Sequence, residues 1–509
     1  MNVIFEGINR FFDFIVPIAD FLWEFPTNFE WYASIPILGK FALAIILLLG
    51  TGIYLTFKTG FIQVMAFKKG IKILATKKTT DTGISPLASF LLSSAMRVGP
   101  GNIMGVTGAI SVGGPGALFW MWVSAFFGMS TAFVESVLAQ IYKEKNGKEY
   151  VGGLPFYGQK ILGDKRWVGV VLSSLFIIYA LFVIPSQAFH LFTSFGSIAD
   201  TIAGKSFGRQ STVYYGIAIV LIITVLLTVI GGIKRVTAVT DIMVPIMAVI
   251  YTVIVILIIL ANLDKVPYFF KEVFGGAFKP NALFGGAFGV ALAQGIKRGL
   301  MSNEAGQGTI TMAAATAEND HPAEQGFVQS LGVFLDTMVI CSMTGFVIVM
   351  AHVWTGTAGV AWDSIQASKL TVYLSSIQYL VPGTALDGTV KIIVSLCYGM
   401  FAFTTLLGLI LFAEVSANLI SRNEKFIMGV RLVGALFFVP FGALTVLAGL
   451  ELKNLWYIGD FVNIVLVYVN VPIILIGSNL ALKALKNYKE TEGSKFNSKS
   501  IGIDSEVWK

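Results

Sequence analysis

The sequence predicts an all-α integral membrane protein of about eleven transmembrane helices, arranged as two inverted five-helix repeats with one extra helix on the N-terminal side. Three observations predict this fold. The 509 residues are 55% hydrophobic and only 13% charged, whereas soluble chains carry roughly a quarter charged residues. Several apolar runs reach the ~20 residues that cross a bilayer. Two of these runs, five spans apart, are interrupted by glycines.

Composition also excludes several classes of function. The three histidines lie far apart, and the two cysteines, Cys341 and Cys397, both fall in apolar runs. We therefore expect no metal cluster, no disulfide framework and no intramembrane enzyme. The sequence contains no Walker-type phosphate loop, which argues against ATP-driven pumping. The formal net charge of +7 reflects basic residues beside the spans rather than a nucleic-acid partner.

Hydropathy places the spans in a regular order along the chain. The segment 1–35, with Trp23, Trp31 and Tyr32, precedes them, and we interpret it as interfacial because aromatic rings favour the boundary between membrane and water. The predicted spans cover residues 36–57, 86–113, 116–141, 167–188, 211–230, 236–262, 281–300, 327–351, 389–420, 427–450 and 455–482.

The distribution of lysine and arginine predicts the orientation of these spans. One side of the predicted membrane holds 25 of the 36 basic residues, and the other side holds ten. By the positive-inside rule, the N-terminus lies outside and the C-terminal tail lies in the cytoplasm. Arg97 belongs to neither set, because it falls inside a span.

The span 86–113 is interrupted at its midpoint by the sequence "VGPGN" at 98–102. Pro100 removes a backbone donor and disfavours helix at the residue before it. Glycines on either side let the chain leave helical geometry at low cost. Unwound backbone at this depth is tolerated only where it is buried in protein or lines a cavity. A simple proline kink is the alternative interpretation.

A second interrupted span, 281–300, carries Gly285, Gly286, Gly289 and Gly295 in a stretch just long enough for one crossing. The first interrupted span enters from the cytoplasm and the second enters from outside. Each therefore opens a unit of five spans, and the two units run in opposite topology. This pattern indicates a secondary transporter whose site lies where the two broken helices meet near the midplane.

The chain accordingly divides into five parts. They are an interfacial segment 1–35, an extra transmembrane helix 36–57, a first five-helix repeat 86–262, a second, inverted repeat 281–482 and a cytoplasmic tail 483–509.

Several signatures resemble those of the alanine or glycine:cation symporter family, the sodium-coupled amino-acid carriers of bacteria and archaea. They are "RVGPGNIMGV", "GGPGALFWMW", "KRGLMSNEAGQG" and "HPAEQGFVQSLGVFLDT". The resemblance covers nearly the whole chain. It implies the leucine-transporter fold with one additional helix, co-transport of sodium, and a multi-pass protein of a prokaryotic plasma membrane. It also implies import of small neutral amino acids such as alanine or glycine, with glutamine preferred by some relatives.

Two departures from the family pattern leave the preferred amino acid open. Pro100 stands where relatives often have threonine or serine, and "GQGTITMAAA" after "SNEA" differs from the commoner "GLGSAP".

The resemblance makes an amino acid the ligand of the first break. A half-helix that starts near Asn102 would point free amides, at the positive end of its dipole, into a cavity, and a carboxylate suits that position. We expect the backbone of Gly99 and Gly101 and the side chain of Asn102 to hold the carboxylate. The alternative for Asn102 is that it caps its own half-helix.

The remaining predicted substrate residues come from other spans. The resemblance assigns the substrate ammonium to Gln187, for which an interfacial position is the alternative. Phe288 is expected to cap the substrate side chain beside Gly285 and Gly289, although a single phenylalanine is more often a packing residue. Thr404 completes the predicted substrate set.

A sodium site is expected where the unwound carbonyls near Ala95 and Val98 face the ninth span. That span offers the hydroxyls of Thr404 and Thr405, and the resemblance to the general fold places a shared sodium site there. The alternative is that both threonines bond back to their own helix.

Two other transport mechanisms stay open. Proton coupling needs a titratable group in the pathway, and Glu135, Asp241, Asp336 and Glu414 are candidates. Asp336 is the deepest of them and is equally suited to pair with Arg97 across helices. An ion channel is disfavoured because the sequence shows no ring-forming selectivity motif and because an inverted pair of breaks suits alternating access.

Overall fold

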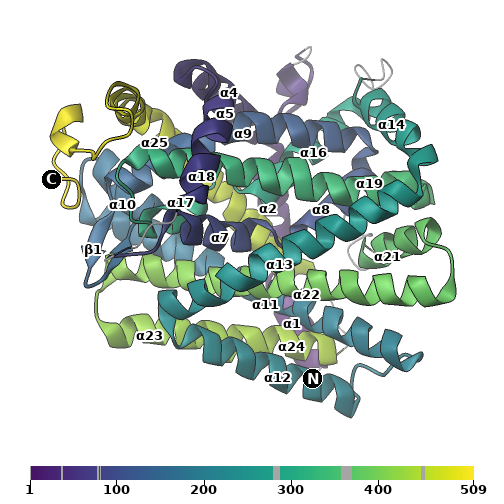
Figure 1. Ribbon diagram of the computed structural model, residues 1–509. Coiled ribbons are helices and arrows are strands. Elements are labelled where there is room, and N and C mark those ends of the chain that lie inside the picture. The colour runs from purple at the N-terminus through teal and green to yellow at the C-terminus, as the bar shows by residue number, and fades with distance from the viewer. Residues whose placement is uncertain are drawn as a thin grey trace.

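The computed structural model describes residues 2–35, 38–76, 80, 82–278, 287–356, 369–448 and 453–509. Helices dominate this part of the chain (Figure 1). The elements of the first half are α1 Asn2–Phe11, α2 Ile15–Glu24, α3 Glu30–Ala33, η1 Leu38–Lys40, α4 Leu43–Thr59, α5 Ile62–Met65, η2 Ala66–Gly70, α6 Ile71–Ala75, α7 Pro86–Arg97, α8 Gly101–Gly113, α9 Gly116–Ile141, β1 Glu144–Asn146, β2 Glu149–Val151, α10 Leu154–Ile161, α11 Arg166–Ala203, α12 Thr212–Val229 and α13 Gly232–Ala261.

The second half is also helical among the described residues. Its elements are η3 Leu263–Lys265, α14 Val266–Phe278, α16 Ala287–Asn303, α17 Ile310–Thr316, α18 Pro322–Val333, η4 Phe334–Cys341, α19 Ser342–Met350, η5 Val353–Gly356, α21 Lys369–Leu380, α22 Thr384–Ile420, α23 Glu424–Val433, η7 Gly434–Phe438, α24 Val439–Leu447, α25 Lys453–Glu490 and η8 Ser498–Ile501. The segments η2, η4 and η7 are π-helical.

Within the described residues, each predicted span coincides with helix except at 98–100 and at the ends of some spans. Eight helical segments of the described ranges are long and apolar enough to cross a membrane, and α4 together with the segment Ile62–Ala75, bent by 68° relative to it, makes a ninth candidate. The two remaining predicted spans, 86–113 and 281–300, are the ones that the sequence marks as interrupted. They correspond to α7 with α8 and to α16, which are each shorter than 18 residues. A multi-pass membrane protein is therefore confirmed, and the total of eleven spans stays a prediction.

The first break lies where the sequence predicts it. Helix α7 begins at the N-cap Ser85, whose hydroxyl accepts a hydrogen bond from the Ala88 amide at 3.1 Å, with Pro86 at the first helical position. It ends at Arg97, and α8 begins at Gly101. The residues between them are non-helical because Pro100 lacks an amide hydrogen and disfavours helix at Gly99.

Within the described residues, the second break follows the predicted span and does not interrupt it. Helix α16 runs without interruption through Gly289 and Gly295, whereas Gly285 and Gly286 lie outside the described residues. After Asn303 the backbone has positive φ at Glu304 (59°), Gly306 (90°) and Gly308 (80°) before α17 begins. Glycine adopts such angles at little cost, so the pair of glycines in "EAGQG" forms this interruption.

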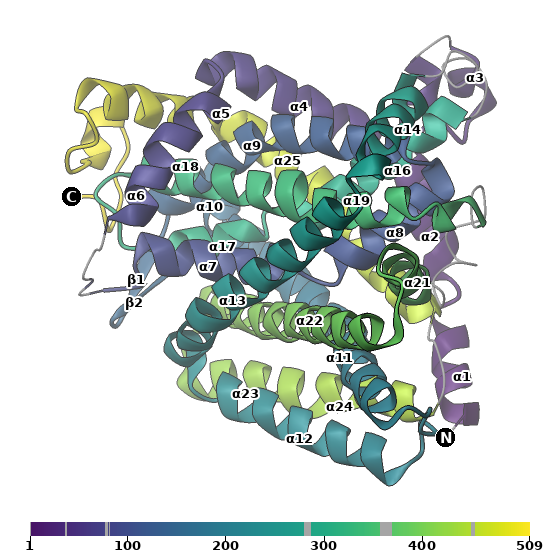
Figure 2. The same ribbon diagram turned by 45° about the vertical axis from the view of Figure 1, so that its right-hand side comes forward.

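The helices pack in layers around one central element. Helix α22 has the most deeply buried membrane window, 89% of which is covered by protein, whereas the windows of α12 and α13 are 28% covered. Figure 2 shows α22 and α11 in the middle, α12, α23 and α24 on one side, and α9, α16 and α4 on the other. Helix α22 is therefore the central helix of the bundle, because its neighbours surround it. Helices α12 and α13 lie at the periphery, where an apolar face contacts lipid.

The chain ends lie at different ends of the bundle (Figure 2). Beyond α25 the C-terminal tail returns to the C-terminal end of α9 and to the N-terminal end of α18. The Trp508 indole donates a hydrogen bond to the Gln140 carbonyl at 2.6 Å, and the Phe496 amide donates to the Asp320 carbonyl at 2.9 Å. At the other end, the Trp23 indole in α2 donates to the Asp460 carbonyl at 3.1 Å.

Glycine permits a close approach of α16 to α9. A Cβ atom built at Gly295 would lie 2.4 Å from the Ala117 carbonyl oxygen and 2.5 Å from the Trp120 Cβ, whereas nothing lies within 4 Å of a Cβ at Gly289. Small residues at such contacts let membrane helices pack closely. The backbone contact therefore depends on Gly295 and not on Gly289.

We predict that Gly295→Ala lowers the thermal unfolding temperature of the purified protein, since overpacking costs about 1–3 kcal/mol. Gly289→Ala on the same helix is the matched control and should leave stability unchanged or raise it by up to about 1 kcal/mol. Thermal unfolding in detergent measures both variants. Equal stability of the two would contradict the described packing of α16 on α9.

Candidate functional site

A cavity of about 350 Å³ lies at the first break. It is bounded by the break between α7 and α8, by α11, by the C-terminal end of α16, by α22 and by the N-terminal part of α25. Of the residues predicted from the sequence, Gly99, Gly101, Gln187 and Thr405 line it. The structure therefore brings together four predicted residues from three separate helical regions.

Asn102 holds the first break in place through protein contacts. Its side-chain Oδ1 accepts a hydrogen bond from the Gly99 amide at 2.8 Å, and its Nδ2 donates to Asp336 Oδ1 at 2.6 Å and to Ser302 Oγ at 3.1 Å. The side chain is completely buried. In this conformation the amide of Asn102 is used to fix the unwound backbone, and Gly101 is the part of the break that is exposed.

The second break is held by a buried carboxylate from α9. Glu135 Oε1 accepts a hydrogen bond from the Gly306 amide at 3.2 Å, and its Oε2 accepts from Asn470 Nδ2 at 3.0 Å. Asn470 also donates to the Gly306 carbonyl at 2.9 Å and accepts from the Tyr157 hydroxyl at 2.5 Å. Both polar groups of Gly306 are thereby satisfied inside the membrane, as its interior requires.

Glu304 is a cavity residue that the sequence analysis did not identify. It lies at the start of the second break, lines the cavity, and accepts a hydrogen bond from the Thr309 hydroxyl at 2.8 Å. The prediction placed this segment in a loop beyond span 281–300, because the earlier glycines drew the break toward them. The signal that could have found it is "AGQG", two glycines one residue apart directly after a polar run.

Asp336 does not pair directly with Arg97, so that hypothesis is wrong for this conformation. The Asp336 carboxylate lies in the π-helical segment η4 and accepts hydrogen bonds from Asn102, from the Ser302 hydroxyl at 2.6 Å and from the Thr337 hydroxyl at 2.8 Å. Neutral donors therefore stabilise this carboxylate. Arg97 instead donates through Nε to the Asn303 carbonyl at 3.2 Å.

The other two candidates for proton coupling lie away from the cavity. Glu414 on α22 forms a bidentate ion pair with Arg431 on α23. Asp241 is exposed on α13. Neither belongs to the lining of the cavity at the first break.

The predicted sodium residues are only partly brought together. The Thr405 hydroxyl lies 3.2 Å from the Ala95 carbonyl oxygen and also donates to the Phe401 carbonyl at 2.8 Å. A Cβ at Gly99 would lie 2.7 Å from this hydroxyl, so glycine allows α22 to approach the break. The Thr404 hydroxyl bonds back to the Met400 and Phe401 carbonyls and lies 3.8 Å from the sulfur of Met247 on α13.

Gln187 lines the cavity and carries an acceptor without a partner. Its Oε1 is buried and has no hydrogen-bond partner among the described residues. Pro185 precedes it inside α11, which continues to Ala203, so Gln187 lies inside its helix and not at the helix end. On the same helix, His190 Nδ1 lies 2.7 Å from the Tyr398 hydroxyl, and both residues line the cavity.

Of the three residues predicted in the seventh span, only Gly289 can be compared with the cavity, and it is not among the lining residues. Gly289 belongs to the outer part of α16, with open space around it. Gly285 lies outside the described residues, and so does the side chain of Phe288. The C-terminal turns of α16 contribute to the cavity instead, through Arg298, Met301 and Ser302.

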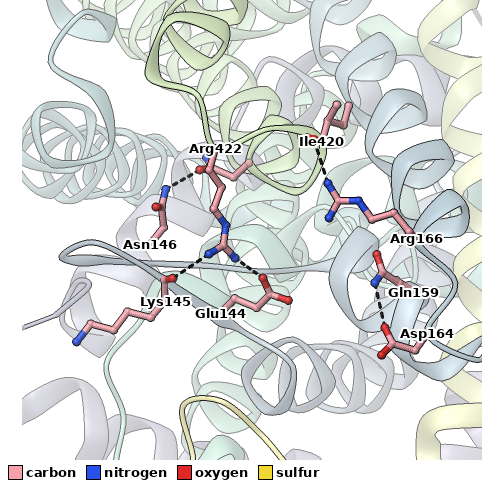
Figure 3. A network of polar contacts seen from close by, with 9 residues as sticks. Glu144, Lys145, Asn146, Gln159, Asp164, Arg166, Ile420 and Arg422 are labelled. Carbon is pink, nitrogen blue, oxygen red and sulfur yellow. Dashed lines mark hydrogen bonds and ion pairs between the residues drawn. The ribbon is translucent and has the colours of Figure 1, made fainter.

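Polar contacts connect the C-terminal end of α22 to the β1–β2 hairpin and to α11 (Figure 3). Arg422, just beyond α22, pairs with Glu144 in the hairpin. Asn146 Nδ2 donates to Asn418 Oδ1 at 2.7 Å, and Arg166 donates to the Ile420 carbonyl at 3.1 Å. The hairpin and the start of α11 are thus bound to the C-terminal end of α22.

Within the described ranges, no group of three or more histidine, cysteine, aspartate or glutamate side chains could hold a metal ion. Any cation at this site would depend on carbonyl, hydroxyl and single carboxylate oxygens.

Comparison with known proteins agrees with this architecture. Residues 30–501 match the model of the sodium:alanine symporter family. The chain is 32% identical to the amino-acid carrier protein AlsT of Bacillus subtilis over 94% of its length and 93% of that protein. It is 32% identical to the probable sodium/glutamine symporter GlnT of the same species (88% and 87%) and 34% identical to the sodium/alanine symporter AgcS of Methanococcus maripaludis (88% and 94%).

These matches span nearly the whole chain and nearly the whole of each relative. The chain is therefore a transporter and not an enzyme, and sodium is the coupling ion of its family. The chain belongs to the sodium:alanine symporter family.

Proposed function

We propose that this protein imports small neutral amino acids, with alanine and glycine as first candidates and glutamine as a further one, by sodium-coupled symport and alternating access. Relatives named as a sodium/alanine symporter and as a probable sodium/glutamine symporter support this range of substrates. The observation that carries the proposal is the cavity at the first break, which is lined by the N-terminal residue of α8 and by Gln187, a residue whose Oε1 has no partner among the described residues.

The two ends of an amino acid would bind to different elements of this cavity. The exposed residue Gly101 at the start of α8 offers its own amide and the positive end of a helix dipole to the carboxylate, while the next three amides donate to the Gly99 and Pro100 carbonyls. Gln187 on α11 lines the cavity, and its unpartnered Oε1 would turn to the ammonium as an acceptor. Asn102 has an indirect role, because its buried side chain accepts a hydrogen bond from the Gly99 amide and thereby holds the unwound backbone in place. Thr404, turned toward α13, is a weaker candidate.

Sodium is placed by this proposal beside the first break. The Ala95 and Thr405 oxygens already lie 3.2 Å apart, and the carbonyl of the non-helical residue Val98 is a third ligand of the proposed site. Thr404, the fourth predicted residue, bonds to its own helix. Neutral oxygens and unwound carbonyls are typical ligands of sodium in broken-helix transporters.

The cavity wall indicates an outward-facing conformation. Arg209, Leu370 and Tyr457, which belong to segments on the predicted outer side, line the cavity. The contacts between the hairpin and α22 close the predicted cytoplasmic side. Transport would require the outer opening to close and these inner contacts to part.

The proposed topology retains the division of the chain that the sequence predicts. The two inverted repeats, 86–262 and 281–482, would contact each other at the two breaks as in the leucine-transporter fold, and 36–57 would be an extra helix. The chain would cross the plasma membrane of a prokaryote, with its N-terminus outside and the tail 483–509 in the cytoplasm.

Proton coupling is the second candidate, because Glu304 places a carboxylate in the cavity wall. A titratable group in the pathway is what proton coupling needs. Uptake of labelled alanine, glycine and glutamine into proteoliposomes, under a sodium gradient and under a proton gradient, separates the two mechanisms. Accumulation driven by sodium alone supports the proposal, and accumulation driven by protons alone rejects it. No accumulation of any of the three amino acids rejects the substrate class.

We predict that Thr405→Val raises the sodium concentration for half-maximal alanine uptake at least about tenfold, a loss of roughly 1.4 kcal/mol of sodium binding, because it removes a hydroxyl that faces Ala95. Thr404→Val is the matched control, since its hydroxyl bonds to its own helix, and it should change this value much less. Sodium titrations of uptake measure both. A larger effect of Thr404→Val than of Thr405→Val would contradict a sodium site at Thr405.

We predict that Asn470→Ala strongly reduces transport and destabilises the protein, because Glu135 loses a donor and the Gly306 carbonyl loses another inside the membrane. An unsatisfied buried group costs about 1–3 kcal/mol. Ser478→Ala on the same helix is the control, because its hydroxyl bonds only to the Leu475 carbonyl of its own helix. Thermal unfolding and alanine uptake of both variants provide the measurement. An Asn470→Ala protein with the stability and uptake of the wild type would show that the second break does not need this contact.

A further inference from the structure

Arg97 is a buried cation whose partners are incomplete. Its side chain is 2% exposed. Nε donates to the Asn303 carbonyl, but neither terminal nitrogen has a hydrogen-bond partner among the described residues. A charge in the membrane interior is costly and is usually functional. Direct pairing does not explain this guanidinium, so its surroundings must.

The C-terminal end of one half-helix contacts this guanidinium. Helix α16 ends at Asn303, whose carbonyl accepts the Arg97 hydrogen bond, and Arg97 itself is the last residue of α7. The C-terminal end of a helix carries partial negative charge and free carbonyls. The guanidinium therefore lies at the negative end of α16, beside the second break.

The neighbouring side chains also favour a positive charge. Glu304, Asp336 and Glu135 attract Arg97 through space. The packing leaves room for the group, because a Cβ atom at Gly332 on α18 would lie 1.9 Å from Arg97 Nη1. A glycine at this point accommodates the guanidinium, and a larger side chain would displace it.

Helix C-termini and unwound carbonyls near the midplane are the positions where transporters with broken helices hold their coupling cations. We propose that the Arg97 guanidinium is a fixed cation that occupies one such position permanently, so that this transporter moves a single sodium ion with each amino acid. The sodium site beside Ala95 and Thr405 is then the one exchangeable cation site. This inference rests on the proposed sodium symport and adds its stoichiometry.

The rival role for Arg97 is as a direct ligand of the substrate carboxylate, because the residue lines the cavity. The structure favours the fixed cation. Nε bonds to a helix-terminal carbonyl, and Nη1 packs on Gly332 in α18, whereas the predicted carboxylate position lies at the start of α8.

The wild-type protein provides the first test. Proteoliposomes with an imposed sodium gradient, alanine gradient and membrane potential give the potential at which net alanine flux is zero, and hence the number of sodium ions per alanine. One sodium ion per alanine supports the inference, and two overturn it. Absence of any sodium dependence would instead be a failure of the proposed function itself.

Variants of Arg97 test whether this residue is the cause. In Arg97→Gln the vacated position should require a second sodium ion, so the Hill coefficient for sodium should rise from about one toward two, within the limit set by the number of sites. Arg97→Lys keeps a positive charge and should keep the coefficient near one. Thr405→Val is the matched control, because it should raise the sodium concentration for half-maximal uptake without changing the Hill coefficient for sodium.

Two results with the variants would overturn the inference. One is an Arg97→Gln protein with first-order sodium activation and only a raised KM for alanine, which would make Arg97 a substrate ligand. The other is an Arg97→Lys protein with second-order sodium activation. If Arg97→Gln does not fold, the stoichiometry of the wild type and the sodium order of Arg97→Lys still decide.

Discussion

Every unwound peptide group in the membrane interior needs a hydrogen-bond partner, because lipid offers none and each unsatisfied group costs several kcal/mol. The two broken helices meet this constraint in different ways. At the first break, the side chain of Asn102 bonds the Gly99 amide and is itself held by Asp336 and Ser302. At the second break, Glu135 and Asn470 bond both polar groups of Gly306.

These partners link the two breaks into one unit. Ser302 at the end of α16 and Asn102 at the start of α8 share the carboxylate of Asp336. Asn303, one residue further, accepts from Arg97 at the end of α7. Direct hydrogen bonds therefore join the two breaks in this conformation.

Sequence reasoning identified the fold class and the first break because both follow from local signals. Apolar length predicts a span, and a proline between two glycines predicts an interruption. It misplaced the second break, because the glycines of 285–295 are more conspicuous than Gly306 and Gly308. Gly295, one of those earlier glycines, has a different role, because it lets α16 pack closely against α9.

Tertiary contacts could not be predicted from the sequence. The sequence shows Thr404 and Thr405 as equivalent neighbours, yet helix rotation directs one hydroxyl to α13 and the other to the break. It also suggested that Arg97 and Asp336 would pair. The structure gives Asp336 neutral donors from Asn102, Ser302 and Thr337 instead, because the π-helical segment presents this carboxylate to α8 and α16.

The C-terminal tail has a consequence for spectroscopy. Trp508 is 5% exposed, with the Lys143 ammonium 4.8 Å from its ring, and Lys143 also donates to the Ala317 carbonyl directly after α17. Indole emission shifts to longer wavelength when water and charge reach the ring. With the other tryptophans replaced by phenylalanine, the fluorescence of Trp508 would report any separation of its ring from Lys143 and from the C-terminal end of α9 in real time, without any attached dye.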